Sequence, residues 1–261
     1  MKKRSADQVF VVIPALDEAA TIGEIVSQCR AILDSPCVVV VDDGSHDNTA
    51  AVAEQNGATV LHHQTNQGKG ASLMDGMRAA VAGGATAVVT LDGDGQHRPQ
   101  DVLRLLECSR TWPEHIVIGS RRAGGKAAPR ARRIANRIAD FWVSWAARHP
   151  IDDSQSGFRI YPARVLSLIA ERPSLARGFA FESEILIEAG RAGIQTIAVD
   201  IPTIYGSVLR RRSHFRPIAD ITTIVLMVGG KLLARMMDPV GLWRALTLKR
   251  LHDSSCHAAV D

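Results

Sequence analysis

Short runs of Val, Ile and Leu alternate with amphipathic helical patterns over the first half of the chain, and this alternation most constrains the fold. The predicted strands are residues 9–14, 38–41, 59–61, 87–91 and 116–119. Strands that are apolar almost without interruption are typical of a parallel sheet buried on both faces. The repeated strand–helix–strand order therefore predicts a doubly wound α/β sheet.

Local signals mark the helices between these strands. Thr21 and Glu24 form a capping-box pattern before an apolar helical repeat, Gly57 is placed to end the second helix, and Pro99 suits a first helical turn. After Ser120 the pattern changes. We predict helices over 131–147, 163–170 and 182–192, a polar loop over "HPIDDSQSGFRIYP", and a further strand in "TIAVDIPTIYG".

Charge is distributed unevenly along the chain. The net charge is only +4, but residues 121–148 hold eight Lys or Arg and one acid, and residues 210–216 hold four Arg and no acid. Clusters of acidic residues lie in the first half instead. We therefore expect the two halves to meet different partners.

Cysteines and apolar segments bear on the location of the protein. The four cysteines form no C-x-x-C pair, which favours ordinary thiols in a reducing compartment. The basic N-terminus lacks a signal-peptide cleavage site, and Lys231 interrupts the most apolar later stretch. We expect a cytoplasmic protein that is not secreted and has no transmembrane helix.

Acidic residues follow three of the predicted strands. The first strand is followed by Asp17 and Glu18, the second by Asp43, and the fourth by Asp92 and Asp94. Ligands of open α/β sheets bind at the carboxyl ends of the strands. Parallel strands would bring these carboxylates to one edge, where they repel each other unless a cation or hydrogen-bond donor lies among them.

A hard divalent cation explains the pair in "LDGDGQH". Alternation along a strand places Asp92 and Asp94 on the same side, and glycines at 93 and 95 leave room for a ligand. Mg²⁺ or Mn²⁺ is commonly held by one or two carboxylates together with substrate phosphates. The alternative is a turn rich in Asp and Gly, or helix caps.

The other strand ends suit a nucleotide. Asp43 or Glu18 could accept hydrogen bonds from a base or ribose, whereas Asp47 and Thr49 fit equally well as helix caps. Lys69 lies between glycines in "NQGKGAS", which is not a Walker A motif. No G-x-G-x-x-G follows the first strand, which argues against a dinucleotide dehydrogenase.

Taken together, these motifs resemble a known family. "VVIPALDEAATIGEIV", "VVVDDGSHDNT", "NQGKGAS" and "LDGDGQH" resemble the successive signatures of family 2 glycosyltransferases with the GT-A fold. "DSQSGFRIYP" and "GFAFESEIL" resemble later motifs of the dolichyl- and polyprenyl-phosphate sugar transferase branch. The resemblance covers residues 9–217 and implies an inverting transferase with a Rossmann-like, mostly parallel sheet flanked by helices.

The resemblance also implies roles for individual residues. A nucleotide-sugar, GDP- or UDP-linked, would lie against Pro14, Ala15, Asp17, Glu18, Asp43, Lys69, Asp92 and Arg121. Asp92 and Asp94 would be the DxD pair that holds Mg²⁺ or Mn²⁺, and Gln96 would complete the metal shell. Relatives often carry Ala where this chain has Gly93.

The acceptor decides whether a base is needed. A sugar or glycan hydroxyl must lose a proton, for which Glu182, Glu184 or Asp153 could serve, although an acid at a helix start is also favoured by the dipole. A lipid phosphate is already anionic and needs cationic clamps instead. Candidate clamps are Arg159, Arg210, Arg211, Arg212, His214 and Arg216; the last five could equally form a solvated basic loop.

The C-terminal part suggests a surface function. Ile221, Val225, Val228, Leu232 and Met236 form one helical stripe, which fits either a membrane interface or packing in a core or oligomer. Trp142 and Trp145 allow the same two interpretations. We expect a catalytic domain over 1–217 and an amphipathic helical extension over 218–261.

Three functions remain possible on the sequence alone. We favour transfer to a lipid-linked or polyprenyl-phosphate acceptor, then transfer to a glycan hydroxyl. A non-enzymatic module that binds membrane or polyanions would leave the acidic strand ends unexplained. We expect no nucleic-acid partner.

Overall fold

The structure is a computed structural model that describes residues 8–33, 37–121, 130–171, 180–202 and 217–253, without the side chains of 130–132, 171 and 217–223. The strands are β1 (Val9–Ala15), β2 (Cys37–Asp42), β3 (Thr59–His62), β4 (Ala87–Thr90), β5 (Ile116–Ser120), β6 (Arg159–Pro162) and β7 (Thr196–Asp200). The helices are α1 (Ile22–Ile32), α2 (Thr49–Gln55), α3 (Lys69–Ala82), the 3₁₀ helix η1 (Pro99–Asp101), α4 (Val102–Thr111), α5 (Arg130–Ala147), α6 (Ala163–Glu171), α7 (Ala180–Arg191), α8 (Pro217–Leu233) and α9 (Pro239–Thr247).

The strands form one seven-stranded sheet within the described residues, in the order β3-β2-β1-β4-β6-β5-β7. All neighbouring pairs are parallel except those that involve β6, which runs antiparallel between β4 and β5. The predicted α/β fold with a mostly parallel sheet is therefore confirmed, and the five strands predicted in the first half all form.

The antiparallel strand β6 was not predicted. We assigned Arg159–Pro162 to a polar loop, and that assignment is wrong because all four residues are buried between two neighbouring strands. Reversal of β6 brings its start, rather than its end, to the carboxyl edge of the sheet, since Thr90 at the end of β4 pairs with Arg159. The segment before β6 consequently joins the acidic strand ends.

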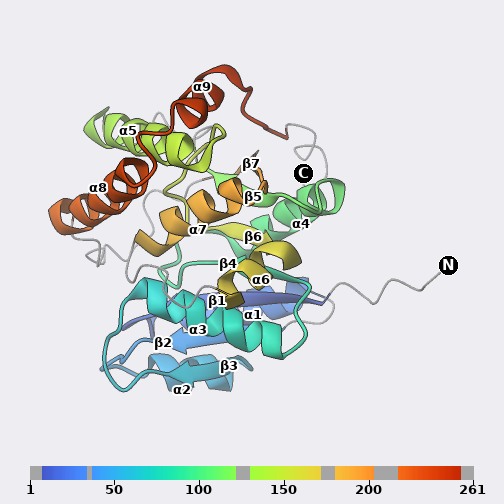
Figure 1. The fold of residues 1–261 in the computed structure, drawn as a ribbon. Coiled ribbons are helices and arrows are strands. Elements are labelled where there is room, and N and C mark those ends of the chain that lie inside the picture. Colours follow the sequence, from blue (N-terminus) through green and yellow to red (C-terminus); the bar gives the residue numbers. More distant parts are fainter. Residues whose placement is uncertain (1–7, 34–36, 122–129, 172–179, 203–216, 254–261) are drawn as a thin grey trace.

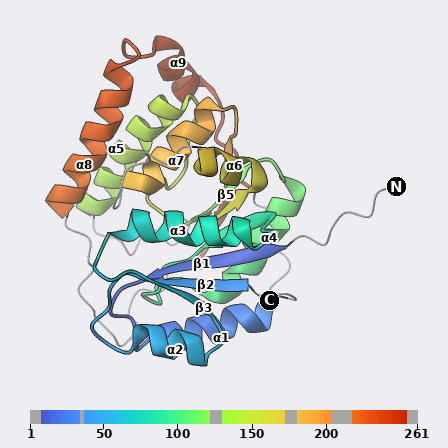
Figure 2. The same cartoon turned by 60° about the horizontal axis from the view of Figure 1, so that its bottom comes forward.

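Side chains of β1 alternate between two buried clusters, one on each face of the sheet. Val12 belongs to the cluster formed with α3, α5, α6, α7 and α8, while Val11 and Ile13 belong to the cluster formed with α1 and α4. Figure 1 and Figure 2 show the sheet between these two layers of helices. Burial on both faces explains why the strands read as continuous apolar runs.

The helix boundaries follow the predicted signals with one difference. Helix α1 begins directly after Thr21, and Gly57, with φ of 88°, follows the end of α2. The Thr21 hydroxyl makes no cap hydrogen bond in α1 but lies 2.7 Å from the carbonyl oxygen of Gly93. The start of α1 was therefore predicted, whereas the contact of the Thr21 hydroxyl with Gly93 was not.

Helices α5, α8 and α9 lie together at the end of the molecule away from α1 and α2 (Figure 1, Figure 2). The predicted C-terminal stripe is divided: Val228 and Leu232 are buried in the core cluster, whereas Val225 and Met236 are exposed. Within the described residues, no helix is both long enough and apolar enough to cross a bilayer. The domain boundary at residues 217 and 218 stays a prediction.

Close packing of α3 on the sheet leads to a first prediction. A Cβ atom at Gly76 would lie 2.4 Å from Val12 Cγ1 and 3.0 Å from Val41 Cγ2, so Gly76→Ala should destabilise the fold by about 1–3 kcal/mol despite the higher helix propensity of alanine. Gly230→Ala in α8 is the matched control, because its Cβ would meet nothing within 4 Å and alanine should there be neutral or stabilising. Urea unfolding of both variants measures the effect, and equal stability of the two would contradict this packing.

Candidate active site at the carboxyl edge of the sheet

Three charged side chains from separate elements meet at the carboxyl edge of the sheet. Lys69 begins α3, Asp92 follows β4, and Glu182 lies in the first turn of α7. Lys69 Nζ lies 2.8 Å from Asp92 Oδ1 and 3.0 Å from Glu182 Oε2. We call Lys69, Asp92 and Glu182 the central cluster. Three of the predicted site residues are thus brought into direct contact.

Gly157 leaves the space that the central cluster occupies. A Cβ atom there would lie 2.9 Å from Glu182 Oε1, 2.9 Å from Lys69 Nζ and 3.0 Å from Asp92 Oδ2. Each distance is shorter than an ordinary van der Waals contact, so only glycine fits without displacing the cluster. The glycine is part of the "SGFR" segment just before β6, and its role became evident only from the antiparallel strand.

The charges of the cluster alter the pKa values of its members. Burial alone would lower the pKa of Lys69, but the carboxylates of Asp92 and Glu182 outweigh burial and raise it. Burial would likewise raise the pKa of Asp92, but the Lys69 ammonium, with smaller contributions from His97 and Arg121, outweighs burial and lowers that pKa. The lysine is therefore protonated and Asp92 ionised at neutral pH.

Asp94 differs from Asp92 although the two are one residue apart. Partial burial, and then the neighbouring charge of Asp92, raise the pKa of Asp94 above its usual range. Asp94 Oδ1 accepts a hydrogen bond of 2.9 Å from the backbone N–H of Gln96. Burial is the larger cause, so the shift reflects desolvation of the Asp94 carboxyl first and its repulsion from the Asp92 carboxylate second.

The ends of β1 and β4 are joined beside the cluster. The Thr21 hydroxyl donates to Gly93 O at 2.7 Å, and the Glu18 backbone N–H donates to Thr49 Oγ1 at 2.7 Å. Pro14 and Ala15 end β1 next to these contacts, and Asp17, with φ of 54°, accepts from the His46 N–H at 2.7 Å. The predicted nucleotide residues at this strand end thus lie on the same edge as Asp92.

A second network surrounds Asp43 after β2. Its Oδ1 and Oδ2 atoms accept hydrogen bonds of 2.8 Å from the backbone N–H groups of Gln67 and Gly68, and its Oδ1 atom lies 2.7 Å from His63 Nδ1. His63 Nε2 in turn lies 3.3 Å from Asp75 Oδ2. Asp43 thereby fixes the loop that leads into Lys69. We did not predict His63, which no motif marks.

Arg121 follows β5 and forms a bidentate pair with Asp153. Its Nε atom lies 3.1 Å from Asp153 Oδ2 and its Nη2 atom 2.9 Å from Asp153 Oδ1. The Arg121 guanidinium is partly buried. Its positive charge acts to lower the pKa values of both Asp92 and Asp94. Asp153, one of the predicted bases, therefore orients an arginine, and the phosphate contact of Arg121 stays a prediction.

Arg159 has an internal role in this structure. Its side chain is fully buried and donates hydrogen bonds to the carbonyl oxygens of Ser154, Ser156 and Glu182 at 2.7–2.8 Å, and to Tyr161 Oη at 3.1 Å. These contacts hold the segment that contains Gly157 against the start of α7. The geometry favours a positioning role over the predicted contact with an acceptor phosphate.

The remaining predicted residues do not join the central cluster. Glu184 Oε1 lies 2.8 Å from Lys231 Nζ, so this carboxylate contacts α8 although it is two residues from Glu182. Residues two apart on a helix point to different sides. Arg210, Arg211, Arg212, His214 and Arg216 lie outside the described residues.

The part of the chain that the structure describes offers few ligands of its own for a metal. Among the described residues, no group of three or more His, Cys, Asp or Glu side chains is arranged to hold an ion. Asp92 and Asp94 supply carboxylate oxygens at one place, which fits a hard cation that takes its other ligands from substrate phosphates and water. The side chain of Gln96, on the exposed rim, stays a predicted ligand.

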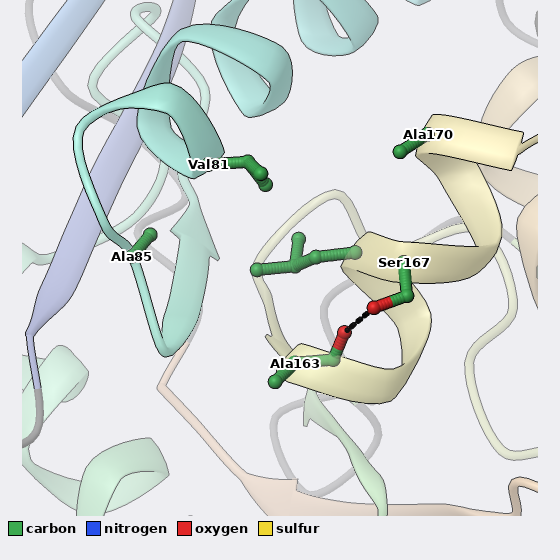
Figure 3. Close-up of a pocket in the computed structure, with 6 residues that line it drawn as sticks. Val81, Ala85, Ala163, Ser167 and Ala170 are labelled. Atoms are coloured by element: carbon green, nitrogen blue, oxygen red, sulfur yellow. Dashed lines mark hydrogen bonds between the residues drawn. The ribbon is translucent and has the colours of Figure 1, made fainter.

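A hollow in the described surface lies elsewhere. It encloses about 330 Å³ between the end of α3 and α6, lined by Val81, Ala85, Ala163, Leu166, Ser167 and Ala170. Figure 3 shows small side chains there, with the Ser167 hydroxyl donating to Ala163 O within α6. Val81 is twelve residues beyond Lys69, about 18 Å along the helix. Without charged groups, this hollow is not the place of the chemistry.

Comparison with known proteins agrees with this geometry. Residues 10–166 match the family described as glycosyl transferase family 2. The undecaprenyl-phosphate mannosyltransferase of Micrococcus luteus is 30% identical over 202 residues, which cover 74% of this chain and 82% of the relative. The UDP-N-acetylglucosamine–dolichyl-phosphate N-acetylglucosaminyltransferase of Methanococcus voltae is 27% identical over 217 residues, covering 76% and 86%.

A solved structure shares the fold. Glucosyl-3-phosphoglycerate synthase from Mycobacterium tuberculosis, crystallised with Mn²⁺, uridine diphosphate and phosphoglyceric acid, superposes with a TM-score of 0.62 at 22% identity, covering 90% of this chain and 80% of that one. At this identity the likeness concerns the fold, which is of the GT-A type. The central cluster lies at the edge of such a sheet, and the family match covers more than half of the chain: this protein belongs to glycosyl transferase family 2.

Proposed function

We propose that the protein transfers a sugar from a nucleoside-diphosphate donor to the phosphate of a polyprenyl lipid, with Mg²⁺ or Mn²⁺ at Asp92 and Asp94. The observation that carries the acceptor class is the similarity over three quarters of the chain to enzymes named for undecaprenyl phosphate and dolichyl phosphate. Those relatives carry different sugars in their names, so the proposal leaves the donor as a GDP- or UDP-linked sugar.

The donor would lie along the edge from β2 to β4. Asp17, Glu18 and Asp43 provide acceptor groups at the ends of β1 and β2, and Pro14 and Ala15 form the adjoining wall. Asp43 is held by backbone N–H groups and by His63, which fixes the shape of this part of the edge. Such rigid polar groups suit recognition of a base and ribose.

The residues present fit a divalent cation at Asp92 and Asp94. The two carboxylates are one residue apart, and the charge of Asp92 adds to burial in raising the pKa of Asp94, a repulsion that a cation would relieve. Such an ion would neutralise the charge that develops on the leaving diphosphate. In support, the structural neighbour from M. tuberculosis was crystallised with Mn²⁺ and, separately, with Mg²⁺.

The transfer exchanges one bond for another at the anomeric carbon. An oxygen of the acceptor phosphate forms the new bond to C1, while the bond from C1 to the diphosphate breaks and its electron pair leaves with the nucleoside diphosphate. Lys69 stands beside Asp92, where a protonated amine can bind phosphate oxygens. A phosphate attacks as an anion, so this reaction needs no proton acceptor.

A hydroxyl acceptor is the second candidate, and one observation favours it. Glu182 Oε1 is buried and has no hydrogen-bond partner among the described residues, so it could accept a proton from a hydroxyl group. The other oxygen of Glu182 is already paired with Lys69, which gives this residue a positioning task in the first candidate. Glu184 is paired with Lys231 and serves neither reaction directly.

The metal site generates a prediction for donor binding. Mn²⁺ should tighten binding of the correct nucleotide-sugar to the wild-type protein, and Asp92→Asn or Asp94→Asn should remove that gain, on the order of tenfold or more, because one anionic ligand is lost. Calorimetry of GDP- and UDP-sugars with Mn²⁺ and with EDTA measures it. The control is Glu114→Gln, because the Glu114 carboxylate is exposed, pairs with Arg164 and lies before β5, at the opposite end of that strand from Arg121. Equally tight donor binding in EDTA would contradict the metal role.

The central cluster generates a second prediction. Gly157→Ala should lower the transfer rate roughly a hundredfold, because the added methyl group displaces Lys69, Asp92 or Glu182 from their contacts. Gly229→Ala, whose Cβ would meet nothing within 4 Å, should leave the rate unchanged. Circular dichroism of both variants verifies the fold. A fully active Gly157→Ala enzyme would show that the cluster has no part in turnover.

The acceptor class can be tested with matched lipids. Polyprenyl phosphate should receive the radiolabelled sugar, whereas the corresponding polyprenol, which differs only in lacking the phosphate, should receive at least about a hundredfold less, since its hydroxyl is a far weaker nucleophile without a base. Thin-layer chromatography of the lipid fraction measures both. Equal labelling of the two lipids would favour the hydroxyl reaction, with Glu182 as its base.

A further inference from the structure

Large apolar side chains are exposed mainly at one end of the molecule. Of the fifteen that are exposed among the described residues, only Val81 and Leu103 lie outside α5 and the segment 225–248. The others are Ile134, Ile138, Phe141, Trp142, Val225, Leu226, Leu233, Met236, Met237, Val240, Trp243, Leu246 and Leu248. Concentration in three adjacent helices, rather than a scatter over the surface, indicates an interaction surface.

Among the described side chains, the exposed charges at this end are of one sign. The exposed charged residues on α5, α8, α9 and their ends include Arg133, Arg137, Arg235, Arg244 and Lys249. The acids whose side chains are described on the same elements, Asp140 and Asp238, are both buried. A surface with exposed apolar groups and cations complements a surface that is apolar within and anionic at its boundary.

Polar contacts fasten α9 to the end of α5, and α8 to α7. Asp238, which caps α9, forms a bidentate pair with Arg148 at 2.7 and 3.0 Å, and its carbonyl oxygen accepts from Trp145 Nε1 at 3.0 Å. Lys231 Nζ lies 2.8 Å from Glu184 Oε1 and 2.6 Å from Glu188 Oε1, which fastens α8 to α7. The exposed groups are therefore presented from a preformed unit, not from separate segments.

The same contacts relate this end to the active site. Helix α7 carries Glu182 of the central cluster in its first turn, and its Glu184 and Glu188, two and six residues further along, hold α8. Helix α7 packs against both α5 and α8. Helix α7 thus connects the central cluster to α8. An acceptor bound at this end of the molecule would lie on the same face of the sheet as α7.

We propose that α5, α8 and α9 form a docking face for an anionic lipid bilayer, with Trp243, Leu246 and Leu226 entering the interface and the arginines contacting lipid phosphates. The proposal rests on the lipid acceptor proposed above. Basic helices with exposed Trp and Leu suit the boundary between headgroups and acyl chains. A second copy of the chain, the other possible occupant, would have to place these like charges against each other.

Vesicle sedimentation of the full-length chain tests the docking face. The protein should bind vesicles of phosphatidylcholine mixed with phosphatidylglycerol, and bind vesicles of phosphatidylcholine alone at least about tenfold less, because the cations find no anionic lipid. Trp243→Glu combined with Leu246→Glu should lower binding to the mixed vesicles on the order of tenfold or more. Leu103→Glu, an exposed leucine on α4, is the control and should bind as wild type.

Unchanged vesicle binding by the double variant, or no binding by the wild-type protein, would overturn the docking face. So would a wild-type dimer that the double variant converts to a monomer while vesicle binding stays the same, since the face would then join two copies. Sugar transfer to a short-chain polyprenyl phosphate without vesicles separates this from the proposed function. If vesicles bind as expected but no polyprenyl phosphate is glycosylated, the acceptor proposal fails and the docking face stands.

Discussion

One ammonium group between two carboxylates determines how the carboxyl edge of the sheet is assembled. Lys69 contacts Asp92 after β4 and Glu182 at the start of α7. It thereby joins the end of β4 to α7 at a place where the two carboxylates alone would repel each other. A lysine in the first turn of a helix is unfavourable with respect to the helix dipole. Its presence there indicates that the carboxylates outweigh the dipole, and Gly157 leaves the room that this contact requires.

The surrounding structure maintains that contact. Because β6 is antiparallel, the chain enters it at the carboxyl edge, and the buried Arg159 holds this entering segment to the backbone of Glu182. Asp43 orders the loop before Lys69 from the opposite side. Lys69 and Glu182 are thus positioned by hydrogen bonds that do not involve a substrate, as a preorganised site for charge stabilisation requires.

Much of the fold could be predicted from the sequence, because buried parallel strands and their helix signals are local patterns. The convergence of Asp92 with Glu18 and Asp43 also followed, since parallel strands share one edge. Strand β6 could not be predicted, as four residues that include an arginine carry no strand periodicity. The same missing strand concealed the roles of Arg159 and Gly157. Likewise the different partners of Glu182 and Glu184 depend on how α7 is rotated between α3 and α8, which spacing alone does not determine.

The two ends of the molecule have distinct physical characters that suit a transferase of this family: a polar edge with fixed charges, and an apolar, basic set of helices fastened to it through α7. The role of Lys69 is tested most directly by a double-mutant cycle of Lys69→Met and Asp92→Asn on the free energy of unfolding. Direct coupling predicts that the double variant loses less unfolding free energy than the two single variants lose in sum, by roughly 1–3 kcal/mol. Additivity within about 0.5 kcal/mol would contradict a central contact between the two side chains.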